Sequence, residues 1–251
     1  MIKRETYMRR IRPFIGNELI KVMTGIRRAG KSVMLELIQE ELICSGVTPE
    51  HFISINFEDL RYMRLLDAMA LHEEILRRAE QIEGKVYLFF DEIQEVTDWE
   101  KCINSFRVSL NCDIYITGSN AKLLSGELAT YLGGRYVEFV IYPFSFSEFL
   151  ELYHTMDPAA SVQQCFKSYL LVGGMPYLSN IRYEEEPAKQ YLTDLFHSVQ
   201  LKDIVKRNKV RDVDLLERVM AYVMANIGTV FSASSLTKFL KNEHRTTSTD
   251  T

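Results

Sequence analysis

The stretch that decides the fold is Gly25-Ile26-Arg27-Arg28-Ala29-Gly30-Lys31-Ser32. It fits the pattern G-x-x-x-x-G-K-[ST] at every position. Glycines in such a loop let backbone N–H groups approach phosphate oxygens closely. A helix that begins at the loop adds its unpaired N–H groups and its dipole, both of which attract anions. The stretch therefore predicts a phosphate-binding loop.

Each residue type in the loop has a chemical task. We expect Lys31 to reach the β- and γ-phosphates of a nucleotide and Ser32 to offer its hydroxyl to Mg²⁺. For Arg27 and Arg28 the sequence leaves three roles open, namely contact with phosphates, with the base or with a partner. The predicted nucleotide-binding set is Gly25, Arg27, Arg28, Ala29, Gly30, Lys31, Ser32 and Val33.

The segments around the loop support this prediction. Short apolar runs, expected as strands, lie at 19–24, 52–57, 86–90, 113–117 and 136–141. Amphipathic segments, expected as helices, lie between them at 32–45, 65–82 and 99–110. Strands that alternate with helices predict an α/β fold with a parallel sheet covered by helices on both faces. Ligands bind such sheets at the carboxyl ends of the strands.

An acidic pair follows the most apolar of these runs. Asp91 and Glu92 come directly after Val86-Tyr87-Leu88-Phe89-Phe90. We expect Asp91 to hold Mg²⁺ through water and Glu92 to act as the general base that polarises the attacking water. Acidic residues also end many strands without any catalytic role, but downstream of a phosphate-binding loop the pair indicates catalysis.

Small polar residues follow the fourth predicted strand. Ser119 or Asn120 would hydrogen-bond the attacking water or the γ-phosphate, as a catalytic sensor. The alternative is a helix N-cap, because Ser or Asn before 121–124 suits a helix start. The two roles are compatible.

Arginine is the expected source of further positive charge in the transition state of phosphoryl transfer. Arg135, after Gly133 and Gly134, is the first candidate, against an ordinary surface arginine after a glycine turn. Further candidates are Arg107, Arg207 and Arg211.

Together these motifs resemble a large bacterial and archaeal family of AAA+-type ATP-binding proteins. The resemblance rests on KVMTGIRRAGKS, INFEDLR, VYLFFDEIQEVTDWEK, IYITGSNAKLLSGELATYLGGR and YPFSFSEFL, in that order, and LLVGGMP and FSASSLTKFLKN are similar to later markers. It implies a P-loop NTPase fold with sheet order 5-1-4-3-2, a helical lid and a winged helix. Family members usually continue into a further nuclease-like C-terminal domain.

This resemblance gives the expected domains. They are an ATPase core at 1–143, a helical lid at 144–227 and an incomplete winged-helix or helix-turn-helix segment at 228–251. Residues 232–241 would form one helix of that motif, and 246–251 would only begin the next. The segment that would lie in a DNA groove is missing, so we expect a fragment or a natural truncation.

Composition narrows the function classes. The net charge of −4 gives no support for whole-surface binding to DNA or to an anionic membrane. Residues 1–31 are nevertheless basic, which predicts either a local basic surface or residues that serve phosphates and a solvated helix face. The four cysteines show no zinc or disulfide spacing, and no apolar stretch is long enough to span a membrane. We therefore expect a cytoplasmic protein with reduced, mostly buried thiols, in which any metal arrives with the nucleotide.

Three functions compete at this stage. The first is an ATPase that hydrolyses ATP with Mg²⁺ to drive conformational change. The second is a nucleotide-gated binding module for DNA or protein, with slow or no hydrolysis. The third, a P-loop kinase, is disfavoured because Glu92 would direct water at the phosphate. A homo-oligomer would be required if the arginine acts from a second subunit.

Overall fold

The computed structural model describes residues 2–118, 132–199, 205, 210, 212–230 and 232–242. The chain divides into two compact units, Met1–Thr193 and Asp194–Thr251. The first unit contains the sheet and the phosphate-binding loop. Neither unit's limits coincide with the predicted domain boundaries at 143 and 227, which stay predictions.

The first unit is built on a five-stranded parallel sheet. Its order is β2-β3-β4-β1-β5, which confirms the expected order. The registers place Lys21 opposite Tyr115 and Val137, and Leu88 opposite Ile53 and Ile114. The strands are β1 (Ile20–Thr24), β2 (Phe52–Asn56), β3 (Val86–Asp91), β4 (Cys112–Thr117) and β5 (Tyr136–Val140).

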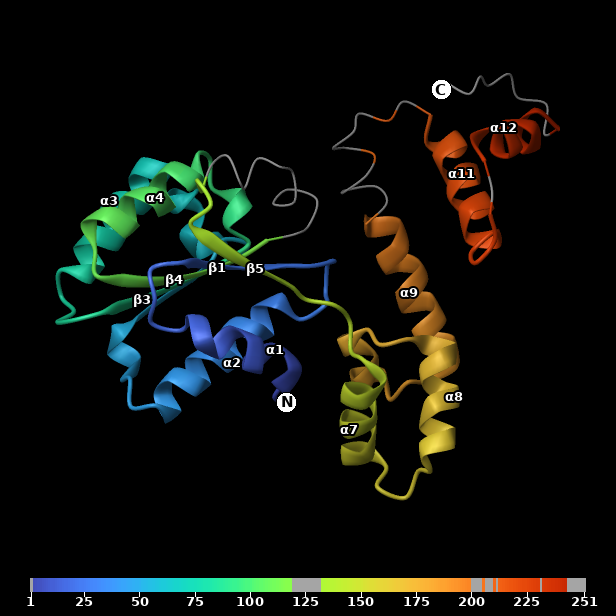
Figure 1. The fold of residues 1–251 in the computed structure, drawn as a ribbon, viewed down its shortest axis with the longest axis horizontal. Coiled ribbons are helices and arrows are strands. Elements are labelled where there is room, and N and C mark those ends of the chain that lie inside the picture. Colours follow the sequence, from blue (N-terminus) through green and yellow to red (C-terminus); the bar gives the residue numbers. More distant parts are fainter. Residues whose placement is uncertain are drawn as a thin grey trace. The chain divides into compact units, whose positions relative to one another are not determined.

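Helices cover both faces of this sheet, as Figure 1 shows. Successive side chains in a strand point to opposite faces, and β3 illustrates the result. Leu88 and Phe90 pack on the side of α3 (Ala68–Ala79) and α4 (Trp99–Ser109). Phe89 packs on the side of α1 (Glu5–Ile11) and α2 (Lys31–Cys44). Because both faces are covered, the strand is largely apolar from Val86 to Phe90, as the sequence predicted, and only its last residue, Asp91, is charged.

The sequence prediction differed from the structure in two elements of this unit. The helix expected at 65–82 begins only at Ala68, because the side chain of Asp67 caps it by accepting from the N–H groups of Met69 and Ala70. A 3-10 helix, Leu60–Leu65, precedes it. Helix α1 was not predicted as an element, although Ile11 is fully buried in the core.

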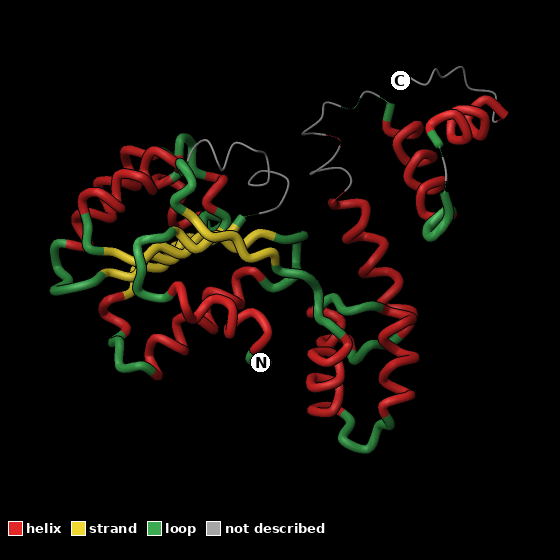
Figure 2. Tube along the Cα trace, in the orientation of Figure 1, coloured by secondary structure: helices red, strands yellow, loops and turns green. Residues whose placement is uncertain are grey.

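The chain continues after β5 as a series of helices, seen in Figure 2 as the red segments beyond the yellow strands. They are α7 (Phe146–Met156), α8 (Val162–Val172) and α9 (Glu185–Val199). Capping boxes at Ser145 and Ser161 fix the starts of α7 and α8. After α8 the chain passes close to the segment before α7: the N–H of Phe144 donates to the carbonyl oxygen of Gly174 at 2.7 Å, and a Cβ at Gly174 would lie 2.1 Å from the carbonyl oxygen of Phe144.

The second unit contains α11 (Val213–Ala225) and α12 (Ala233–Asn242). The rings of Tyr222 and Phe239 join the two helices at a centroid distance of 4.9 Å. In the described part of the chain, no helix combines the length and apolar character that crossing a membrane requires.

Candidate phosphate-binding site

The loop between β1 and α2 has the backbone of a phosphate cradle. Gly25 has φ 147° and Gly30 has φ 96°, and Arg28 also lies in the left-handed region at 62°. Glycine is required at position 25 for a second reason. A Cβ there would lie 2.2 Å from the carbonyl oxygen of Ile141, so no side chain fits. Gly30 then caps α2, and the unpaired N–H groups of the helix face the loop.

Lys31 and Glu92 meet at the carboxyl edge of the sheet. Lys31 is only 5% exposed, and its Nζ lies 3.6 Å from Oε1 of Glu92. The same nitrogen donates to the carbonyl oxygen of Ile26 at 3.4 Å. The structure thus joins the loop to the acidic pair across a long sequence separation, as the two motifs required.

Asp91 is held by two neighbouring strands. Its Oδ1 accepts from the hydroxyl of Thr117 at the end of β4, and its Oδ2 accepts from Nδ2 of Asn56 at the end of β2 at 3.1 Å. The carboxyl group is thereby fixed in orientation at the edge where ligands bind.

Glu92 has a strained backbone and a supported side chain. Its φ is 53°, an uncommon value for a residue other than glycine. Its N–H donates to Oγ1 of Thr117 at 2.9 Å, and Nε2 of Gln94 donates to its Oε2. Conformations of this kind are frequent at functional sites, and the side chain of Glu92 lies beside that of Lys31.

The donors available for a metal ion suit Mg²⁺ bound with a nucleotide. Ser32, in the first turn of α2, offers a hydroxyl and is exposed, and Asp91 offers a carboxylate. These hard oxygen donors suit an ion that keeps several waters and takes phosphate oxygens. Among the described residues there is no cluster of three or more His, Cys, Asp or Glu side chains that would hold a metal alone.

The remaining residues of the predicted binding set surround the loop. Ala29 is fully buried, Arg27 and Val33 are half-buried, and Arg28 is exposed. The guanidinium carbon of Arg28 lies 5.8 Å from the centre of the Tyr191 ring in α9. Arg28 is therefore turned towards the helical part of the first unit.

Arg135 lies at the opposite end of the sheet from the loop. Its carbonyl oxygen accepts from the N–H of Ile20, the first residue of β1, whereas the loop follows the last. Five strand residues at about 3.3 Å each place roughly 16 Å between the two ends. That separation is beyond the reach of an arginine side chain, so Arg135 does not serve the loop of its own chain.

Arg107 is also at that opposite end. It lines a polar hollow with Lys85, Asn111 and Cys112, which stand at the amino ends of β3 and β4. Its Nε and Nη1 are buried without a hydrogen-bond partner among the described residues. Arg107 therefore lies too far from the phosphate-binding loop of its own chain to supply positive charge there. The other candidates, Ser119, Asn120, Arg207 and Arg211, lie outside the described residues.

Several polar partners of the site are not among the residues predicted for it. Thr117 and Asn56 support Asp91, Gln94 supports Glu92, and Arg4 binds the carbonyl oxygen of Ala29. Thr117 and Asn56 are the polar ends of apolar strands, which was the available signal. Arg4 was part of the basic stretch at 1–31, but no motif distinguished it from the other cations there.

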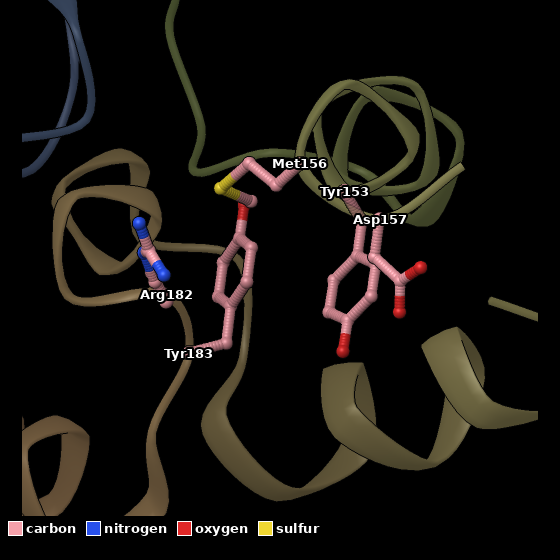
Figure 3. Close-up of a pocket in the computed structure, with 5 residues that line it drawn as sticks. All are labelled: Tyr153, Met156, Asp157, Arg182 and Tyr183. Atoms are coloured by element: carbon pink, nitrogen blue, oxygen red, sulfur yellow. The ribbon is translucent and has the colours of Figure 1, made fainter. Parts of the chain in front are cut away.

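A second hollow lies in the helical part of the first unit and is drawn in Figure 3. It is lined by Tyr153, Met156, Asp157, Arg182 and Tyr183. The rings of Tyr153 and Tyr183 stack at 5.3 Å, and burial raises the pKa of Tyr183 to about 12, so its hydroxyl stays protonated. This hollow contains no residue of the phosphate-binding loop.

Two family models match the chain. Residues 17–150, more than half of it, match a family described as AAA domain, and residues 163–250 match a domain of unknown function. The AAA match spans the loop, the acidic pair and all five strands.

Two relatives are similar to this chain in sequence and extend beyond its length. An uncharacterized protein of Haemophilus influenzae is 39% identical over 252 residues, which is 100% of this chain and 62% of the relative. One of Methanocaldococcus jannaschii is 33% identical over 235 residues, 87% of this chain and 50% of the relative. The chain thus spans less than two thirds of either relative.

Two solved structures are similar at lower identity. The Aeropyrum pernix ORC1 protein in complex with DNA has a TM-score of 0.46 and 12% identity, over 95% of this chain and 76% of that one. AMPPCP-bound DnaA from Aquifex aeolicus has a TM-score of 0.43 and 13% identity, over 94% of this chain and 82% of that one.

Proposed function

Because the chain belongs to the AAA domain family, whose P-loop fold supports nucleotide binding, we propose that it binds ATP with Mg²⁺ and hydrolyses it to ADP and phosphate. The observation that carries the proposal is the 3.6 Å approach of Lys31 Nζ to Glu92 Oε1. It brings the expected phosphate-binding cation and the expected general base to one edge of the sheet.

The contacts of these two residues suggest how binding prepares hydrolysis. A buried ammonium group needs a nearby anion, and Glu92 supplies it. When the γ-phosphate takes over the contact with Lys31, Glu92 is released to accept a proton from the attacking water. Mg²⁺, held by Ser32 and Asp91, would neutralise charge on the phosphate oxygens. Gln94 and Thr117 keep Glu92 in place during this exchange.

A charge from a second subunit would complete the site. Arg135 is exposed at the far end of the sheet, so it is suited to reach the phosphates of a neighbouring copy. Ser119 or Asn120 would contact the attacking water. We therefore propose that full turnover requires a homo-oligomer, and that the free energy of hydrolysis moves the helical part that follows β5.

The test of hydrolysis compares the parent with Glu92→Gln and with Glu95→Gln, an exposed carboxyl group three residues away. Phosphate release and ATP affinity are measured on the same samples with Mg²⁺. We expect Glu92→Gln to bind ATP and lose at least about 100-fold in turnover, as removal of a general base does. We expect Glu95→Gln to match the parent.

The outcomes separate the two candidate functions. If the parent binds ATP but releases no phosphate at any protein concentration, the nucleotide-gated module is the better account. DNA as the partner of such a module stays a prediction, tested by salt-dependent binding that changes with the nucleotide.

A further inference from the structure

Arg4 stands outside the matched AAA segment, which begins at residue 17, yet it is built into the phosphate-binding loop. It is only 3% exposed. Its Nη1 donates to the carbonyl oxygen of Ala29 at 2.9 Å, and its Nη2 donates to that of Tyr142, just beyond β5, at 2.8 Å. A Cβ on Gly30 would lie 3.5 Å from the same Nη1, so the guanidinium also lies against the loop's second glycine.

The remaining side of Arg4 faces the first helix after the sheet. Its Nε donates to Oε1 of Glu148 in α7 at 2.9 Å, and the Glu148 side chain is 10% exposed. Oε2 of Glu148 accepts from the N–H of Ser145 at 2.8 Å, which closes the capping box of α7. The rings of Tyr7 and Phe144 enclose the guanidinium at 4.6 and 5.1 Å. One side chain thus joins α1, the loop, the end of β5 and α7.

The contact with Ala29 has a consequence for the loop. A peptide unit is planar, and its C=O and N–H point in opposite directions. When Arg4 holds the carbonyl oxygen of Ala29, the N–H of Gly30 in the same peptide unit is turned away from Arg4, into the loop. A charged donor on the carbonyl also polarises the unit and strengthens that N–H as a donor.

We propose that Arg4 is a positioning residue of the nucleotide site, and that the Arg4–Glu148 pair couples ATP binding in the loop to the position of α7. The proposal rests on the proposed binding of ATP at Gly25–Ser32. A shift of α7 pulls on the guanidinium that orients the Ala29–Gly30 peptide, and ATP bound in the loop favours the arrangement in which the pair is formed. Such coupling is reciprocal, so each event changes the other's equilibrium by the same factor.

The variants are chosen to weaken the link while keeping the fold. Arg4→Lys keeps the charge but loses the planar fork that contacts Ala29, Tyr142 and Glu148 together. Glu148→Gln keeps the size of the side chain and an acceptor for Ser145. Arg12→Lys is the matched control. Arg12 lies in the same N-terminal segment as Arg4 and also donates hydrogen bonds to carboxylates, those of Glu5 and Glu41, but it does not contact the loop.

Equilibrium titration with ATP is the first measurement. We expect Arg4→Lys to raise the Kd for ATP about five- to tenfold, the value of one or two lost hydrogen bonds. We expect Glu148→Gln to raise the Kd for ATP by a smaller factor. In the double variant the Kd should rise by less than the product of the two single factors, because both substitutions break the same Arg4–Glu148 link. Arg12→Lys binds as the parent does. If Arg4→Lys melts at a lower temperature yet binds ATP as the parent does, Arg4 is merely structural and the proposal is wrong.

The second measurement is the rate of hydrogen exchange of the α7 backbone with and without ATP. If the Arg4–Glu148 pair were merely structural, ATP would not change this rate. ATP slows exchange in α7 of the parent and of Arg12→Lys, and this effect is lost in Glu148→Gln. If Arg4→Lys does not fold, Glu148→Gln alone decides. If the parent binds ATP but its hydrogen exchange in α7 does not change, the coupling is wrong and the proposed function stands. If the parent does not bind ATP, both the proposed function and this inference are wrong.

Discussion

Among single residues, Thr117 has two tasks at the site: its hydroxyl donates to Asp91 and accepts from the N–H of Glu92. Valine has nearly the same shape but would leave both partners without this hydrogen bond. We expect Thr117→Val to reduce ATP turnover at least about tenfold, since each buried group left unsatisfied costs about 1–3 kcal/mol. We also expect the Mg²⁺ concentration for half-maximal turnover to rise.

Thr117→Ser is the control for this prediction, because serine keeps the hydroxyl and loses only a methyl group. Turnover is measured over a Mg²⁺ titration for both variants. Parent-like turnover and Mg²⁺ dependence in Thr117→Val would show that the hydroxyl does not position the acidic pair.

The carboxyl group of Glu148 should make the stability of the fold depend on pH. Burial alone would raise the pKa of its carboxyl group, but the hydrogen bonds from Arg4 and Ser145 outweigh burial and hold the pKa below its ordinary value of 4.5. The folded protein therefore prefers the charged form. This contribution to the free energy of unfolding is fully present above about pH 4.5 and is lost as the pH falls through the lower, folded pKa.

The measurement is the free energy of unfolding of the parent and of Glu148→Gln between pH 7 and pH 3. We expect the parent's advantage over the variant to shrink as the pH falls through the acidic range. An advantage that stays constant down to pH 3 would contradict the assigned direction of the shift.

How much of the site was predictable also differs from residue to residue. Lys31, Asp91 and Glu92 belong to local patterns, and the structure places them at one edge of the sheet, two of them in direct contact. Asn56 and Arg4 act across the fold, and no local pattern records which strand or helix they will meet. The position of Arg135 was predictable, because a residue directly before a strand of a parallel sheet lies at the amino edge, opposite the edge where the loop lies.

At the scale of elements, helix α1 is the main difference from expectation. The basic residues of the N-terminal segment drew attention to charge, whereas its buried face consists of Tyr7, Met8 and Ile11. Alternating strands and helices predicted a parallel sheet, but the strand order came from family resemblance, since alternation alone fits several orders. The described strands match their predicted positions because apolar runs in a covered sheet are sharply bounded.

A core substitution tests whether α1 belongs to the folded core around the sheet. Ile11 is fully buried, and Ile11→Ala would lower the free energy of unfolding by about 2–5 kcal/mol, as truncations in close-packed cores do. Arg9→Ala, on the exposed face of the same helix, should change it by less than about 0.5 kcal/mol. Chemical denaturation measures both, and a small loss for Ile11→Ala would mean that α1 is a loosely attached segment.

At the scale of the whole molecule, the proposed homo-oligomer can be tested through Arg135, which lies too far from the loop of its own chain to serve it. Lys31→Ala is expected to lose nucleotide binding but keeps Arg135. Arg135→Ala keeps the phosphate-binding loop but lacks the arginine. We expect each variant alone to be inactive and a mixture of the two to regain part of the parent's turnover, since an intact loop then meets an intact arginine. Turnover by Arg135→Ala at the parent's rate, or no recovery in assemblies shown to be mixed, would contradict this.

The relatives extend beyond the length of this chain, which spans 62% and 50% of the two compared. Helices α11 and α12 of the second unit lie within the match to a domain of unknown function. The described residues of the proposed nucleotide site all lie in the first unit.

The most direct test of the account is the affinity of the chain for ATP beside that of Lys31→Ala, measured by equilibrium titration with Mg²⁺. We expect saturable binding by the parent and a loss of at least about 100-fold in the variant, because the buried cation proposed to contact the phosphates is removed. Equal affinities, or no binding by a folded parent, would contradict the claim that residues 25–32 hold the nucleotide.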